Sequence, residues 1–220
     1  MSLLREYIKS LLKERVRPSA FSIQDFKGLE WQEMKSYLDT HLVRLGKGSS
    51  RIVYRYSSSY VIKFAFNEAG LAQCEQEIQV FNDNTMKPLV AKIKDYDNHG
   101  RWLLSEIVRP LNNDQEFFEL LGLKPGKNMN GNVVVNWGTS IREVALRLHT
   151  TSKEKLEKLL ASVPSEAKQK LGALWHAMHE ADLAFVDLKD YDHWGKSASE
   201  ELALLDYGYS NEISMKYYSS

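Results

Sequence analysis

The feature that most constrains the fold of this 220-residue chain is a change of hydrophobic period near residue 42. Before that point apolar residues recur at helical spacing, whereas the segment that follows contains short β-rich runs separated by glycine, serine and asparagine. The runs predict strands at 41–45, 51–56 and 59–66, a helix at 68–84, and strands at 90–96 and 101–108. This order predicts an antiparallel sheet that carries one helix.

The rest of the chain is predicted to be mainly helical, which makes the fold class α+β. Helical patterns cover 113–121, 139–149, 152–160 and 165–181, and a loop is predicted at 124–132. The short apolar stretches 183–186 and 202–205 favour a small hairpin around a polar loop. We therefore expect three units: a helical extension at 1–41, a sheet lobe at 42–108 and a reduced helical lobe at 109–220.

The first helix, at 3–16, has an apolar stripe and ends before Pro18, and a second helix is predicted from Ser22 to about His41. The stripe has two interpretations. It docks on a protein partner, or it packs on its own domain, and the sequence leaves both open.

Charge and cysteine content limit the classes of partner and the compartment that we expect for this chain. The 29 Lys and Arg residues balance the 29 Asp and Glu residues, so bulk attraction to nucleic acid or to a membrane surface is not expected. No apolar run is long enough for a membrane helix, and the charged start is unlike a secretory signal. The single cysteine, Cys74, cannot form an internal disulfide. We expect a cytoplasmic protein.

A glycine-bearing turn and a strand lysine are candidates for binding phosphate. Gly46 and Gly48 lie between two predicted strands, where backbone N–H groups can approach phosphate oxygens. Lys63 lies between apolar neighbours in a later strand and therefore needs an anionic partner. Glu77 on the following helix is one candidate for that partner, and Glu75 is another.

Acidic residues end two apolar stretches near the C-terminus. A carboxylate such as Asp187 can orient a hydroxyl group and accept its proton. Asp192 and Asp206 offer the hard oxygen ligands that Mg²⁺ prefers. Each of these residues alone is typical of a solvated loop, and their combination is more specific.

Taken in chain order, these residues resemble the protein kinase superfamily over about 42–210. Gly46, Gly48 and Val53 match the glycine-rich loop, and Lys63 matches the strand lysine that pairs with a helix glutamate, here Glu77. The resemblance implies that the carbonyl of Glu106 and the N–H of Val108 bind adenine. It further implies that Asp187 and Lys189 act in catalysis and that Asp192 and Asp206 hold metal.

Four departures separate the chain from the usual kinase pattern. Arg51 replaces the third glycine of the loop, Phe185 and Val186 replace the His-Arg before the catalytic aspartate, and Asp192 replaces the metal-binding asparagine. His193 is an alternative occupant of that last site. Only 12 residues follow Gly208, so the chain is more similar to small phosphotransferases of the aminoglycoside-kinase or lipopolysaccharide-kinase type, and to compact bacterial or phage kinase-like proteins.

The resemblance implies a minimal phosphotransferase that uses ATP and Mg²⁺ to phosphorylate a hydroxyl group on a protein or small molecule. The alternative is an inactive kinase-fold protein that binds or scaffolds. Such a protein could be a phage virion or assembly component, since the opening residues 3–9 are similar to the openings of tailed-phage proteins. It would then reside in the host cytoplasm or the virion.

Overall fold

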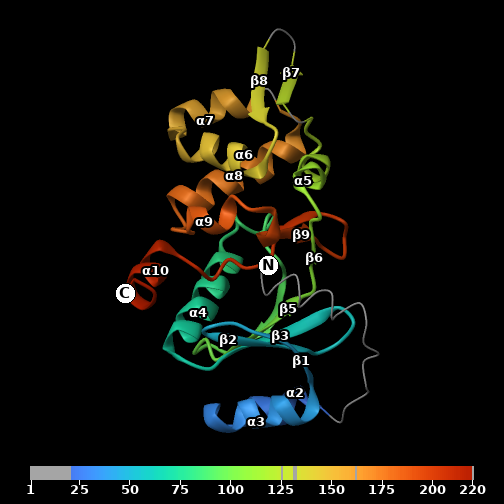
Figure 1. Ribbon diagram of the computed structural model, residues 1–220, viewed down its shortest axis with the longest axis vertical. Coiled ribbons are helices and arrows are strands. Elements are labelled where there is room, and N and C mark those ends of the chain that lie inside the picture. Colours follow the sequence, from blue (N-terminus) through green and yellow to red (C-terminus); the bar gives the residue numbers. More distant parts are fainter. Residues whose placement is uncertain (1–20, 125, 131–132, 162, 220) are drawn as a thin grey trace.

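The computed structural model describes residues 21–124, 126–130, 133–161 and 163–219. An antiparallel sheet with its helices forms one end of the molecule, and a mainly helical part forms the other (Figure 1). The predicted α+β class is therefore confirmed. The helix predicted at 3–16 lies outside the described residues. The predicted unit boundaries at 41 and 108 stay a prediction.

The sheet has five strands in the order β1-β2-β3-β5-β4, and every neighbouring pair is antiparallel. The strands are β1 (Val43–Lys47), β2 (Arg51–Arg55), β3 (Tyr60–Ala65), β4 (Ile93–Tyr96) and β5 (Trp102–Glu106). The helix α4 (Glu68–Asn82) joins β3 to β4, and the side chain of Asn67 caps its first turn. The predicted order of elements is thus confirmed for this part of the chain.

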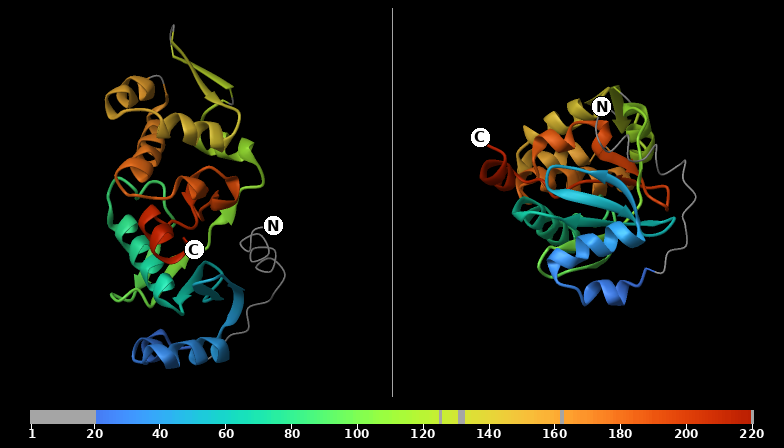
Figure 2. Two further views of the ribbon diagram at one scale, coloured as in Figure 1. Left: turned by 60° about the vertical axis from the view of Figure 1, so that its left-hand side comes forward. Right: turned by 60° about the horizontal axis from the view of Figure 1, so that its bottom comes forward.

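Two helices, α2 (Ile23–Lys27) and α3 (Trp31–His41), cover the face of the sheet opposite α4 (Figures 1 and 2). Alternate strand residues point into this core, because side chains of a strand alternate between its two faces. The core consists of Phe26, Met34, Leu38, Ile52, Tyr54, Ile62, Phe64, Trp102 and Leu104. The sequence predicted one helix here, but the chain breaks at Gly28, and a capping box at Glu30 starts α3.

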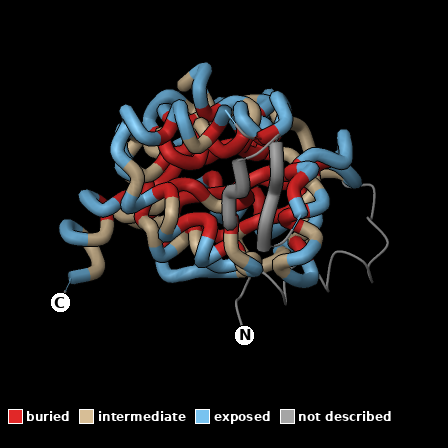
Figure 3. Tube along the Cα trace, turned by 90° about the horizontal axis from the view of Figure 1, so that it is seen from above, coloured by how far each residue is buried: buried red, intermediate tan, exposed pale blue. Residues whose placement is uncertain are grey.

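The second part buries a larger core and is built mainly from helices. Its helices are α5 (Asp114–Leu121), α6 (Ile141–His149), α7 (Lys153–Leu160), α8 (Ser165–His179), α9 (Phe185–Leu188), the 3₁₀ helix η1 (Tyr191–His193) and α10 (Asn211–Tyr217). Its strands are β6 (Arg109–Pro110), β7 (Gly126–Asn130), β8 (Val133–Gly138), β9 (Trp194–Lys196) and β10 (Leu202–Leu204). Seen from above, buried segments run through the interior and exposed segments surround them (Figure 3). Within the described ranges, no helix has both the length and the apolar character that a membrane crossing requires.

Two local predictions for this part are wrong. The segment predicted as a loop at 124–132 contains β7, which pairs with β8 in a two-stranded sheet. The stretch predicted as a strand at 183–186 instead enters α9, and β10 pairs with β9. Leu183 instead forms an isolated bridge with Ser210, outside the predicted partner stretch. Short apolar runs do not distinguish a strand from a helix, which explains the second error.

Candidate functional site

A cavity of about 320 Å³ lies between the sheet and the second part of the molecule. This volume is at the small end of the range for ligand pockets, roughly 300–1,000 Å³. Seven residues predicted for the nucleotide site line it, namely Gly46, Gly48, Val53, Lys63, Glu106, Val108 and Asp206. Arg51, Val61, Ser105 and His193 also line it. The structure therefore brings together residues from β1, β2, β3, β5 and the loop after β10.

The alternation of strand residues explains which side chains reach the cavity. Val53 pairs with Lys63 across β2 and β3, so both lie on the face opposite the α2–α3 core. Arg51 lies two residues before Val53, and Val61 lies two residues before Lys63, so these side chains share that face. Lys63 is thereby placed at the cavity although its strand neighbours are apolar.

Lys63 forms a buried ion pair with Glu77 on α4. The Lys63 Nζ atom lies 2.7 Å and 2.9 Å from the two Glu77 carboxylate oxygens and also donates to the Leu205 carbonyl at 3.0 Å. The Glu77 side chain is fully buried, whereas Glu75 is exposed. Glu77, rather than Glu75, is therefore the partner of Lys63.

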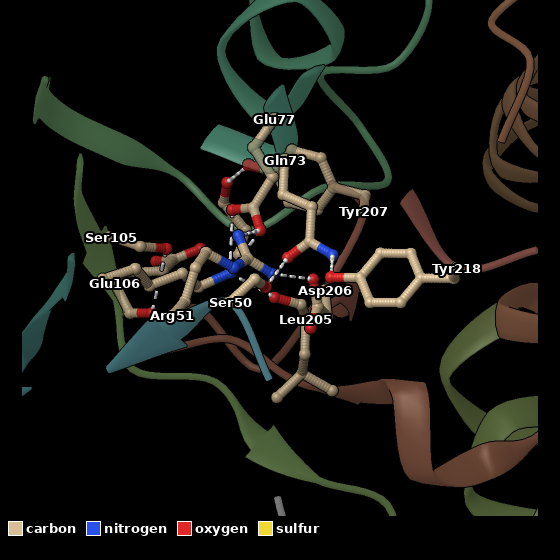
Figure 4. Close-up of polar contacts among 12 residues, drawn as sticks. Ser50, Arg51, Gln73, Glu77, Ser105, Glu106, Leu205, Asp206, Tyr207 and Tyr218 are labelled. Carbon is tan, nitrogen blue, oxygen red and sulfur yellow. Dashed lines mark hydrogen bonds and ion pairs between the residues drawn. The ribbon is translucent and has the colours of Figure 1, made fainter. Parts of the chain in front are cut away.

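Arg51 forms a second bridge in the same site (Figure 4). Its Nη1 donates to Glu77 Oε1 at 2.5 Å, and its Nη2 donates to Asp206 Oδ1 at 2.6 Å. Burial opposes the charge on Arg51, but the carboxylates of Asp206 and Glu77 raise the pKa of its guanidinium well above the usual value. Burial also acts to raise the pKa of Asp206, and Arg51 and Lys63 outweigh it and hold that pKa well below its usual range.

The loop that carries Asp206 is fixed by contacts with the segment before β4. Leu204 donates its N–H to Leu89 O at 2.6 Å, and Ala91 donates to Leu204 O at 3.1 Å. The Tyr207 hydroxyl donates to Ala91 O at 2.7 Å, and its ring lies under Lys63 Nζ, 5.8 Å from the centroid. Asp206 is thus held at the cavity by its flanking residues.

Asp187 approaches the same region from α9. The Ala184 N–H donates to Tyr209 O at 3.1 Å, and this bond ties the start of α9 to the chain just after Asp206. Burial, with a contribution from the Asp206 carboxylate, raises the pKa of Asp187 to about 6, and His193 opposes the shift. His193 Nε2 lies 4.0 Å from Asp187 Oδ1, and its ring reaches the cavity.

Four predicted residues are not among those that line the cavity, namely Glu77, Asp187, Lys189 and Asp192. Lys189 follows α9, where it is half-buried, and Asp192 lies in η1, also half-buried. The alternative raised by the sequence, His193, is the residue of this segment that faces the cavity.

The sequence analysis identified Arg51 only as a departure from the kinase pattern. Its spacing of two residues from Val53 was the signal that its side chain lies on the cavity face of β2.

The described residues do not fit the magnesium ion that the resemblance implies. Of the two predicted ligands only Asp206 faces the cavity, and its Oδ1 accepts a hydrogen bond from Arg51. Across the described segments there is no group of three or more His, Cys, Asp or Glu side chains that could hold a metal ion. In this arrangement the charge beside Asp206 is a guanidinium.

Comparisons with known proteins give little guidance. No family model matches the chain, and no curated protein matches it. The solved structures that match include SAICAR synthase from Saccharomyces cerevisiae in complex with SAICAR, with a TM-score of 0.35 and 10% identity. The match covers 76% of this chain and 73% of that chain. A likeness at this TM-score carries no argument, so function must be inferred from the geometry of the site.

Proposed function

We propose that this protein binds ATP in the cavity and transfers the γ-phosphate to a hydroxyl group of a protein or small-molecule acceptor. The observation that carries the proposal is the buried Lys63–Glu77 ion pair at a cavity that Asp206 also lines. A lysine held in this way has a fixed direction at the cavity that it lines, as the binding of a polyphosphate requires. Because the reaction consumes ATP, the proposal places the protein in the cytoplasm.

The nucleotide would lie along the cavity with its base at β5 and its phosphates at Lys63. Glu106 and Val108 line the end proposed for adenine, where the kinase resemblance implies backbone hydrogen bonds. Ile107 donates its N–H to Ser59 O at 2.8 Å, which fixes this segment. Val53 and Val61 offer apolar surface to the base, and the turn at Gly48 covers the phosphates.

In the proposed reaction the acceptor oxygen attacks the γ-phosphorus. The bond from this phosphorus to the β–γ bridging oxygen breaks, and ADP leaves with the electron pair. Asp187 accepts the hydroxyl proton, and a pKa of about 6 leaves its carboxylate available as a base near neutral pH. The cations of Lys63 and Arg51 stabilise negative charge on the phosphates. These roles for Asp187 and Arg51 are part of the proposal.

A second candidate function is nucleotide binding without transfer, as in an inactive kinase-fold protein. The observation that favours it is the ion pair of Arg51 with Asp206, which engages a carboxylate that the resemblance assigns to metal binding. In that case the protein would bind or scaffold a partner through a surface whose conformation depends on the bound nucleotide.

The experiment that separates these candidates follows the label of γ-labelled ATP. The purified full chain is incubated alone, to detect autophosphorylation, and with protein and small-molecule hydroxyl acceptors. We expect transfer by the wild type, loss of transfer in Asp187→Asn, and retained transfer in Asp190→Asn, whose side chain is exposed nearby. Saturable ATP binding without transfer to any acceptor would instead establish the second candidate.

A further inference from the structure

Arg51 lies where the kinase resemblance places a metal ion, against the carboxylate of Asp206. We infer that its guanidinium supplies the positive charge there, and that the cavity therefore binds the triphosphate of a nucleotide without a divalent metal ion. The inference deepens the proposed function and rests on its claim that a nucleotide occupies this cavity.

The geometry of Arg51 fits a fixed cation. Its side chain is 10% exposed, and its two terminal nitrogens contact carboxylates from different elements, Glu77 on α4 and Asp206 after β10. A guanidinium carries five N–H donors, so these two oxygens leave donors for a phosphate at the cavity that Arg51 lines. Arginine is well suited to this task, because its planar fork matches the oxygens of a phosphate.

Charge balance also favours a guanidinium over a metal ion. Lys63 and Arg51 together match the charges of Glu77 and Asp206, the carboxylates that contact them. A divalent cation on Asp206 would lie beside the Arg51 guanidinium in a partly buried site, where like charges repel strongly. Arg51 would then have to give up its contact with Asp206, and breaking this partly buried ion pair is costly.

The segments that pack next to Arg51 support this placement of its side chain. Gly208 approaches the site so closely that a Cβ atom there would lie 2.5 Å from Gln73 O and 3.2 Å from Arg51 Nη1. Ser50, the residue before Arg51, donates its hydroxyl to Gln73 Oε1 at 2.8 Å, and Gln73 Nε2 donates to Tyr218 at 3.1 Å (Figure 4). The start of β2 is thus held against α4 and the C-terminal segment, which keeps the guanidinium in place.

The test is calorimetric titration of the full chain with ATP, once with EDTA and once with excess magnesium. We expect the two dissociation constants to agree within about threefold. Arg51→Ala should weaken binding in EDTA by about tenfold or more, as expected for the loss of a charged hydrogen bond. Arg51→Lys should weaken it less, because the charge remains. Arg44→Ala, on an exposed position of β1, is the matched control and should bind as the wild type does.

A second variant keeps the inference falsifiable even if Arg51→Ala does not fold. Asp206→Asn removes the carboxylate but leaves Arg51, so ATP should still bind in EDTA, with a dissociation constant equal to or lower than that of the wild type. Binding that requires magnesium and is lost in Asp206→Asn would overturn the inference and leave the proposed function standing. If ATP binds in neither medium, both are overturned.

Discussion

The Asp187 carboxyl group is the residue whose protonation should govern the proposed reaction. Its pKa is about 6 in the folded protein, against about 3.9 in an unfolded chain, and burial is the main cause. The folded state therefore holds this proton more tightly than the unfolded state. The resulting contribution to stability is complete below about pH 4 and is lost as the pH rises through about 6.

The rate of transfer should instead rise with pH, because Asp187 must be ionised to act as the base. We expect kcat/KM to fall about tenfold per pH unit below pH 6 and to reach a plateau above it. Asp187→Asn should lower the rate by roughly 10²–10⁴-fold and remove this acid limb. Asp190→Asn should keep the limb and move its midpoint slightly lower, because the Asp190 charge contributes to the raised pKa of Asp187. A wild-type profile with no limb near pH 6 would contradict the role of Asp187 as the base.

The Glu77 carboxylate should matter for stability as well as for binding. It is fully buried and balances both Lys63 and Arg51. Glu77→Gln leaves these two cations with one fewer negative charge, which should lower the free energy of unfolding by about 3 kcal/mol. Urea denaturation measures this loss, and Glu75→Gln, exposed on the same helix, should change stability by less than about 0.5 kcal/mol. Equal urea midpoints for the two variants would show that the ion pairs of Glu77 with Lys63 and Arg51 do not stabilise the fold.

At the scale of single residues, much of the site could be predicted from the chain. Lys63 was predictable because a lysine with apolar strand neighbours needs a carboxylate, and Asp206 because it ends an apolar run. The direction of Arg51 was not predicted, although its spacing to Val53 indicates it, and its two partners could not be predicted. Those partners come from α4 and from the loop after β10, 26 and 155 residues away, and only the folded chain brings them together.

At the scale of elements, the contact between α4 and the loop after β10 depends on Gly208. Gly208→Ala would place a Cβ atom 2.5 Å from the Gln73 carbonyl, closer than atoms pack, so backbone must move. We expect a loss of about 1–3 kcal/mol in thermal or urea unfolding.

The control for this variant is Gly172→Ala in α8, where the nearest atom to an added Cβ is Leu160 Cδ1 at 3.8 Å. There the substitution should be neutral or stabilise by about 0.5–1 kcal/mol, because alanine favours helix more than glycine does. If both alanine variants unfold at the same denaturant concentration as the wild type, the close packing at Gly208 is absent in solution.

Element boundaries were less predictable than the order of elements. The order of strands and helix along the chain could be expected because the periods change clearly between 42 and 108. The break between α2 and α3 at Gly28 was missed, because both halves share one apolar stripe. The β7–β8 hairpin was missed because glycine and asparagine are typical of loops. The pairing of β10 with β9, which starts between Leu202 and Lys196, was missed because β9 lies in the stretch predicted as a polar loop.

At the scale of the whole molecule, ion pairs and hydrogen bonds connect the two parts around the cavity. Arg51 links the sheet to the loop after β10, and His176 on α8 contacts Asp83 at the end of α4, with 2.6 Å between Nε2 and Oδ2. A nucleotide in the cavity would contact both parts. Its binding should therefore stabilise the molecule as a whole and raise the midpoint of thermal unfolding as its concentration increases.

The most direct test of nucleotide binding in this cavity is a titration of ATP, with magnesium present, against the wild type, Lys63→Ala and Lys94→Ala. Lys94 is exposed on β4 and lies outside the cavity lining. We predict saturable binding of one ATP per chain, weakened about tenfold or more in Lys63→Ala and unchanged in Lys94→Ala. ATP that does not bind, or that binds Lys63→Ala as tightly as the wild type, would contradict the assignment of this cavity as a nucleotide site.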